Sequence, residues 1–231
     1  MKHFFNPLNP FFRFMGLIVD LIGVNLLFLL CCVPIVTIGP ALCALYTVAM
    51  RLVRNTADTP VRSFWQAFRQ NLRQGIILEL LSVSVGALLL YNTWLSVQLR
   101  IGQQHPVYTV LLALCMISLL LFVCIAIYLF PLQAQFDNTV KGTLRAALLM
   151  SIRHLPKTFC AAALPAGVAW LAMRSVGTFA FTCVAMLLIG FVIIAYLQSH
   201  LFVSVFDVYI RQQQDDAAAE AVQASAEENA S

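Results

Sequence analysis

The sequence feature that most limits how this chain can fold is one long uncharged stretch. Val107–Pro131 contains no Asp, Glu, Lys, Arg or His, and a helix needs only about 20 apolar residues to cross the hydrocarbon core of a bilayer. Inside that core each backbone polar group must be hydrogen-bonded within the protein, which a helix achieves. Val107–Pro131 therefore predicts a membrane-spanning helix.

The composition of the whole chain agrees with that of this stretch. Of its 231 residues, 61% are hydrophobic and 10% are charged, whereas soluble domains carry about 25% charged residues. Because so few charges cannot cover a water-facing surface, most of the surface must face lipid. We therefore expect an all-α, polytopic membrane helix bundle. The other predicted spans are Phe14–Val36, Pro40–Val53, Ile76–Leu99, Phe159–Met173 and Val176–Gln198.

The placement of basic residues predicts how the spans are oriented. Pro40–Val53 is short for a span, and it either crosses the bilayer or lies in its interface. If it crosses, there are about six spans, and twelve basic residues lie on the side of both termini against two, Arg100 and Arg174, on the other. The positive-inside rule then places the N- and C-termini in the cytoplasm. The twelve are Lys2, Arg13, Arg51, Arg54, Arg62, Arg69, Arg73, Lys141, Arg145, Arg153, Lys157 and Arg211.

The end of the chain differs from the rest. From about Gln212 to Ser231 it consists mainly of Ala, Gln, Glu and Asp, with almost no side chain to bury. We therefore expect a single membrane domain over residues 1–211 and a disordered acidic tail over residues 212–231.

Two cytoplasmic segments are predicted to be short amphipathic helices. In the first, Thr59 suits an N-cap and Pro60 suits the first helical position. Each segment is either a collar that anchors its neighbouring spans or a surface that binds a cytoplasmic partner. The apolar faces are Val61, Phe64, Trp65, Phe68 and Leu72 in the first and Val140, Leu144, Leu148 and Ile152 in the second. The candidate docking residues on the opposite faces are Arg62, Arg69, Arg73, Arg145 and Arg153.

Three polar residues inside the predicted spans are candidates for a role in structure or transport. Asp20 and Glu79 lie near the cytoplasmic ends of their spans, and a charge at membrane depth costs at least about 2.5 kcal/mol. Either they pair with Arg13, Arg51 or Arg54 and lock helices together, or they carry a transported solute. Asn25 lies deeper, and we expect it to hydrogen-bond across helices.

No motif in the sequence indicates catalysis or a cofactor. Nothing resembles a nucleophile elbow, a phosphate loop or a nucleotide-binding glycine turn, and the four histidines are far apart in the chain. All cysteines lie in apolar stretches and act as small apolar residues. We expect no enzyme activity, no metal, no cofactor, no disulfide and no nucleic-acid partner. The cysteines are Cys31, Cys32, Cys43, Cys115, Cys124, Cys160 and Cys183.

Several motifs along the chain resemble the YesL-like family of bacterial integral membrane proteins, a domain of unknown function. They occur in order from about residue 4 to past residue 200. They are Phe5–Pro7, Asn9–Phe14, Asp20–Ile22, Asn25–Leu27, Cys31–Gly39, Ala44–Tyr46, Leu52–Arg54, Ser63–Phe64 with Phe68, Phe130–Leu132, Phe136–Thr139 and Ile152–Thr158. The resemblance implies a protein of the bacterial cytoplasmic membrane that accompanies carbohydrate uptake systems, and it supplies no catalytic residues.

A second likeness concerns the later cytoplasmic segment. Arg145–Pro156 is similar in outline to the coupling loop of sugar ABC-importer permeases, which rests on the ATPase subunit. The segment lacks the glycine of that loop, and Arg145 stands where the loop opens with an acidic residue.

These features lead to three hypotheses on function. The first is an accessory or permease-like subunit associated with carbohydrate uptake systems of the ABC type. The second is a regulatory or scaffold protein that binds a membrane sensor or another membrane protein. The third is an independent small transporter that uses Asp20 and Glu79. A water-lined cavity in the middle of the membrane favours the third, and a packed bundle with an apolar flank favours the other two.

Overall fold

The computed structural model describes residues 10–54, 56, 59–102, 105–136 and 139–230, with the side chains of 15–210 within these ranges. These residues form helices and short connections, and no strand occurs among them. The elements are α1 (Pro10–Cys31), η1 (Ile35–Thr37), α2 (Ile38–Val53), α3 (Pro60–Gly102), α4 (Pro106–Gln135), α5 (Val140–Arg153), α6 (Leu155–Ala172), α7 (Val176–Ala185), η2 (Met186–Gly190) and α8 (Phe191–Ala230).

Five helical runs are long and apolar enough to cross a membrane, so the predicted all-α polytopic membrane fold is confirmed. The short segment Pro40–Val53 belongs to one of them. The part of α1 whose side chains are described, Met15–Cys31, is apolar but shorter, and the whole helix has 22 residues, a length that suits a span. The five runs are Ile35–Val53, Pro60–Gly102, Pro106–Gln135, Leu155–Ala172 and Val176–Ile210.

The first predicted surface helix is not a separate element. α3 has 43 residues and is therefore roughly 64 Å long, about twice the thickness of the hydrocarbon core. Only Gly75 interrupts the good helix formers between the basic segment and the span, and a single glycine costs a helix no more than about 1 kcal/mol. The basic segment and the span thus form one continuous helix.

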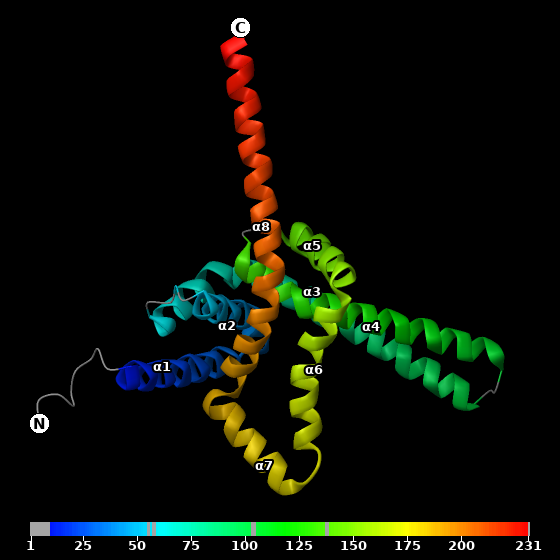
Figure 1. Cartoon of the computed structure of the whole chain (residues 1–231). Coiled ribbons are helices and arrows are strands. Elements are labelled where there is room, and N and C mark those ends of the chain that lie inside the picture. The colour runs from blue at the N-terminus through cyan, green and yellow to red at the C-terminus, as the bar shows by residue number, and fades with distance from the viewer. Residues whose placement is uncertain (1–9, 55, 57–58, 103–104, 137–138, 231) are drawn as a thin grey trace, which may run out of the picture.

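Helix α2 lies at the centre of the fold and packs against α3, α4 and α8 (Figure 1). Its crossing with α3 is close because glycines lie on both helices. A Cβ atom added at Gly39 would lie 2.5 Å from the carbonyl oxygen of Gly75, and one added at Gly75 would lie 2.8 Å from the backbone nitrogen of Pro40. Small residues at such crossings let two membrane helices pack backbone to backbone.

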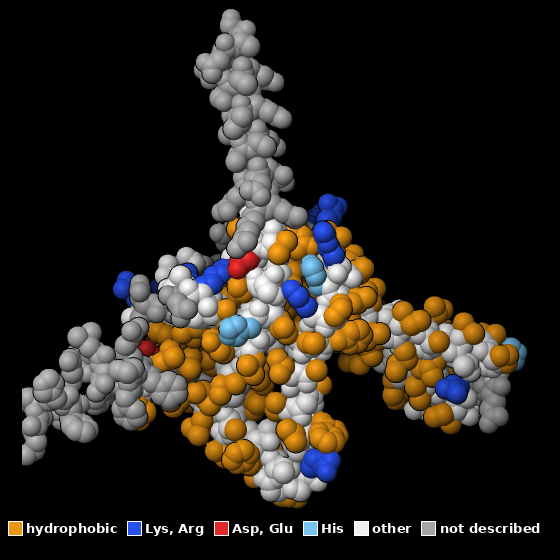
Figure 2. Space-filling model, in the orientation of Figure 1, with side chains coloured by type: hydrophobic (Ala, Val, Ile, Leu, Met, Phe, Trp, Pro, Cys, Tyr) orange, Lys and Arg blue, Asp and Glu red, His pale blue; other side chains and the backbone are white. Residues whose placement is uncertain are grey.

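Two helical hairpins extend from this centre as arms. Figure 1 shows the outer part of α3 with α4 on one side, and α6 with α7 on another. Figure 2 shows that apolar side chains cover both arms, with a basic group near each tip. Leu88 on α3 is 61% exposed and Leu114 on α4 is 58% exposed. These surfaces suit contact with lipid.

The last helix differs from the expectation for the tail. α8 continues as helix to Ala230, where the composition predicts disorder from residue 212. Ala, Gln and Glu are all strong helix formers, so a segment with nothing to bury can extend an existing helix. The division of the chain into a membrane domain and a tail stays a prediction.

Candidate functional site

Among the described side chains, the two carboxylates in the spans are not paired with the arginines that we expect. Asp20 is half-buried and Glu79 is 9% exposed, and among the described side chains neither makes an ion pair. The Arg13 side chain lies outside the described residues. Arg54 instead pairs with Asp207 on α8 at 2.8 Å. The predicted pairing of Asp20 or Glu79 with Arg54 is therefore wrong.

Asp20 and Glu79 are also far from each other. Gly23 on α1 packs against Val61 on α3, where an added Cβ would lie 3.3 Å from the Val61 Cγ2 atom. Asp20 is one turn from Gly23, whereas Glu79 is 18 positions beyond Val61, which is about 27 Å along the helix. Asp20 therefore lies beside the start of α3, whereas Glu79 lies near the middle of that helix.

Arg54 connects three helices at the cytoplasmic ends predicted for them. It follows the last residue of α2, donates one hydrogen bond to Gln135 on α4 at 2.8 Å, and binds Asp207 on α8 through its other nitrogen. The side chains of Arg54 and Asp207 are 29% and 44% exposed, so the pair is partly screened by solvent. Its role is to hold α2, α4 and α8 together.

Asn25 makes the hydrogen bonds that join α1 to the junction between α7 and α8. It lies fully buried on α1 and donates from its amide nitrogen to the carbonyls of Met186 at 2.9 Å and Leu187 at 2.8 Å. Its oxygen accepts from the Val192 backbone N–H at 3.3 Å. Met186 and Leu187 begin the π-helix η2, where the chain bends between α7 and α8 (Figure 1).

A buried polar network joins α3, α4 and α5. Gln133 is 3% exposed and donates to Gln74 at 2.5 Å and to Asn71 at 3.4 Å, while its oxygen accepts from the Thr143 hydroxyl at 2.9 Å. This network is not among the contacts predicted from the sequence. One feature of the sequence could have indicated it: the polar Gln133 lies just after the end of an uncharged span. Its two amide partners on α3 are Asn71 and Gln74.

The α5 helix is present as predicted, and a face other than its apolar stripe packs against the rest of the protein. Its buried residues are Thr143, Ala147, Met150 and Ser151. Of the predicted apolar stripe, Leu144 is 41% exposed, Leu148 40% and Ile152 55%. The apolar stripe is therefore free to lie against lipid, as expected for a helix at the membrane surface, while small and polar residues pack against the neighbouring helices.

The structure separates the five candidate docking arginines into two groups. Arg62, Arg69 and Arg73 lie exposed along α3, with the Arg69 guanidinium 5.0 Å from the Trp65 ring centre. Arg145 and Arg153 lie on α5. The Arg153 guanidinium is 5.7 Å from the Tyr209 ring centre, so it contacts α8, whereas Arg145 lines a pocket.

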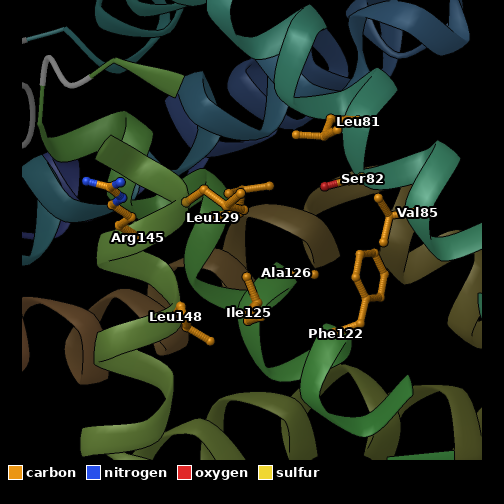
Figure 3. Close-up of a pocket in the computed structure, with 10 residues that line it drawn as sticks. Leu81, Ser82, Val85, Phe122, Ile125, Ala126, Leu129, Arg145 and Leu148 are labelled. Carbon is orange, nitrogen blue, oxygen red and sulfur yellow. The ribbon is translucent and has the colours of Figure 1, made fainter. Parts of the chain in front are cut away.

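That pocket lies between α3, α4 and α5 and has a volume of about 350 Å³ (Figure 3). Neither Asp20 nor Glu79 lines it, nor do they line the pockets described at the outer ends of α3 and α4 and between α2, α4 and α8. Its lining residues are Leu81, Ser82, Val85, Phe122, Ile125, Ala126, Leu129, Leu144, Arg145 and Leu148.

No metal centre is formed by the described residues. No three of their His, Cys, Asp or Glu side chains lie close enough together to hold an ion, and the seven cysteines are free thiols.

His154, at the junction of α5 and α6, should make stability depend on pH. Burial, with smaller effects of Lys157 and Arg153, lowers the pKa of His154 below its usual value. The unfolded chain then takes up the proton first, so stability falls as pH drops below about 6.5. We expect His154→Gln to reduce the fall of the melting temperature in detergent at acidic pH. An equal acid loss in the wild type and His154→Gln would contradict the assignment.

The comparisons with known proteins all find proteins of uncharacterised function. The family described as "Protein of unknown function, DUF624" matches residues 21–93. "Uncharacterized protein YesL" of Bacillus subtilis (strain 168) is 27% identical over 169 residues, which cover 73% of this chain and 78% of that protein. "Uncharacterized protein YteU" of the same organism is 26% identical over 151 residues, 65% of this chain and 66% of that protein. No solved structure matches the chain. The resemblance found in the sequence motifs is therefore confirmed: this multi-pass membrane protein is similar to the YesL-like proteins, and its residues 21–93 match the DUF624 family.

Proposed function

We propose that this chain is a non-enzymatic accessory subunit of the bacterial cytoplasmic membrane, with both termini in the cytoplasm, that binds a carbohydrate importer of the ABC type. The observation that carries the proposal is the arginine row of α3, formed by Arg62, Arg69 and Arg73. The kind of partner follows from the YesL-like resemblance, which implies an association with carbohydrate uptake.

The arginine row has the properties of a docking surface. Its three residues are spaced seven and four positions apart, so they lie along one face of the helix. The opposite face is fixed in the core, where Phe64 is fully buried and Phe68 is 9% exposed. None of the three arginines has an ion pair among the described residues, so their charges are available to an acidic protein surface.

The third hypothesis, an independent transporter, has less support. Asp20 and Glu79 lie on different parts of the fold, and neither lines a described pocket. A transport site in the membrane needs its ionisable groups around one cavity. We therefore keep binding of another membrane protein as the main function.

The test is co-purification in mild detergent, with the bound subunits identified by mass spectrometry. We expect the subunits of a carbohydrate ABC importer to co-purify with the wild type. The triple variant Arg62→Glu, Arg69→Glu, Arg73→Glu should lower their yield at least tenfold, since three surface ion pairs of up to about 1 kcal/mol each are reversed. The matched control is Arg100→Glu with Arg174→Glu, on the two arm tips, which should leave the yield unchanged.

Each other outcome excludes part of the proposal. If a membrane sensor or another membrane protein co-purifies through the same arginines, the chain is a regulator or scaffold and the importer assignment is wrong. If the triple variant binds the importer as well as the wild type does, the arginine row is a membrane-anchoring collar. Solute uptake into vesicles that contain this chain alone, lost in Asp20→Asn or Glu79→Gln, would establish the transporter instead.

A further inference from the structure

The pocket between α3, α4 and α5 combines apolar walls with a single charge. Among its lining residues Arg145 is the only charged one, and Ser82 is the only other polar one. In Figure 3, Arg145 lies at one end of the pocket, and Val85 and Phe122 lie at the other. Its volume of about 350 Å³ is within the range of about 300–1,000 Å³ found for ligand sites. Such a pocket fits a molecule with an apolar chain and an anionic head.

The charge of Arg145, at one end of the pocket, is available for a ligand. Arg145 is exposed and has no ion pair or hydrogen bond among the described residues. Lys141 lies one helical turn before it on the same face of α5 and is also exposed. An arginine can bind a phosphate through two parallel hydrogen bonds, and the lysine adds a second positive charge.

The surroundings of the pocket favour a ligand that comes from the bilayer. Next to Arg145, the side chains of Leu144, Leu149 and Ile152 are 41%, 61% and 55% exposed, which suits a helix lying against lipid. From Leu129 to Phe122 the pocket follows α4 for roughly 10 Å. A soluble polar ligand would find only Arg145 and Ser82 to bind there.

We propose that this pocket binds one anionic phospholipid, with an acyl chain between α3 and α4 and its phosphate on Arg145 and Lys141. Anionic lipids are concentrated in the cytoplasmic leaflet, and basic pockets between helices on that side bind their head groups. In this proposal Arg145 binds lipid, whereas the arginine row of α3 binds protein. The lipid site does not depend on the identity of any protein partner.

The test is native mass spectrometry of the full chain. The protein is stripped of lipid, placed in nanodiscs of phosphatidylcholine with a minor share of phosphatidylglycerol, extracted again, and analysed for retained lipid. We expect phosphatidylglycerol to be retained in preference to phosphatidylcholine. Arg145→Gln should lower its retention about tenfold, the effect of losing charge-assisted hydrogen bonds to one phosphate. Ser82→Phe, which adds a ring inside the pocket, should lower the retention of both lipids.

Two controls make the outcome decisive. Arg153→Gln removes an arginine of the same helix that contacts Tyr209 and does not line the pocket, and it should leave lipid retention unchanged. Inorganic phosphate should not raise the melting temperature of the lipid-free protein, whereas phosphatidylglycerol should. The proposal is overturned by equal retention of the two lipids, by an equal effect of Arg153→Gln and Arg145→Gln, or by stabilisation with inorganic phosphate alone.

Discussion

Gly75→Ala is expected to lower the free energy of unfolding by about 2 kcal/mol, and the melting temperature in detergent by roughly 4–8 °C. The added Cβ would lie 2.8 Å from the Pro40 nitrogen and 2.9 Å from both its Cα and its Cγ. Two of these three atoms are backbone, so α2 and α3 must move apart to accommodate the methyl group. That separation outweighs the gain of about 1 kcal/mol that alanine brings inside a helix. Size-exclusion chromatography of heated, fluorescently tagged protein measures the change.

Gly167→Ala in α6 is the matched control for this prediction. It makes the same substitution inside a membrane helix, but nothing lies within 4 Å of the added Cβ. We expect an unchanged or slightly raised melting temperature. If both variants melt like the wild type, the close crossing of α2 and α3 does not contribute to stability.

Asn25→Leu is expected to cost about 2–4 kcal/mol. It removes the two hydrogen bonds to Met186 and Leu187 and the one from Val192, and hydrogen bonds in membrane proteins contribute about 0.6 kcal/mol on average. The larger part of the cost comes from buried backbone groups of η2 that lose their partner, at about 1–3 kcal/mol for such a group. Leucine has a similar volume, so the loss reports hydrogen bonding.

Hydrogen–deuterium exchange shows whether the loss arises at the π-helix. In Asn25→Leu the amides of residues 186–192 should exchange faster than in the wild type, while those of α2 change less. Asn92→Leu, an exposed asparagine on α3, is the control and should alter neither the melting temperature nor the exchange. Unchanged exchange at 186–192 in Asn25→Leu would mean that η2 is maintained by its own packing.

The sequence predicts the spans of this fold well because their cause is local. A run such as Val107–Pro131 must form a helix in lipid wherever the other runs lie. The end of a helix is harder to predict from sequence. The change from basic to apolar residues before Ile76 indicates where the surroundings of α3 change from water to lipid, but the helix continues through it.

The packing faces and the polar contacts were harder to predict. Lipid is as apolar as a helix interface, so the stripe of Leu144 and Leu148 does not reveal which face of α5 is buried. The polar character of Asn25 is visible in the sequence, but its acceptors are backbone carbonyls of a distant π-helix. Likewise, nothing local shows that Arg54 binds Asp207, 153 residues away.

The bond between Asn25 and η2 also has a consequence for how the protein is made. The Met186 carbonyl is synthesised 161 residues after Asn25, which takes roughly 8–32 s at about 5–20 residues per second. Throughout that interval the Asn25 amide, in a nascent first helix, has no native acceptor. Until η2 has been made, the Asn25 amide must be hydrogen-bonded by water or by other polar groups, and α1 can take its final position only after that.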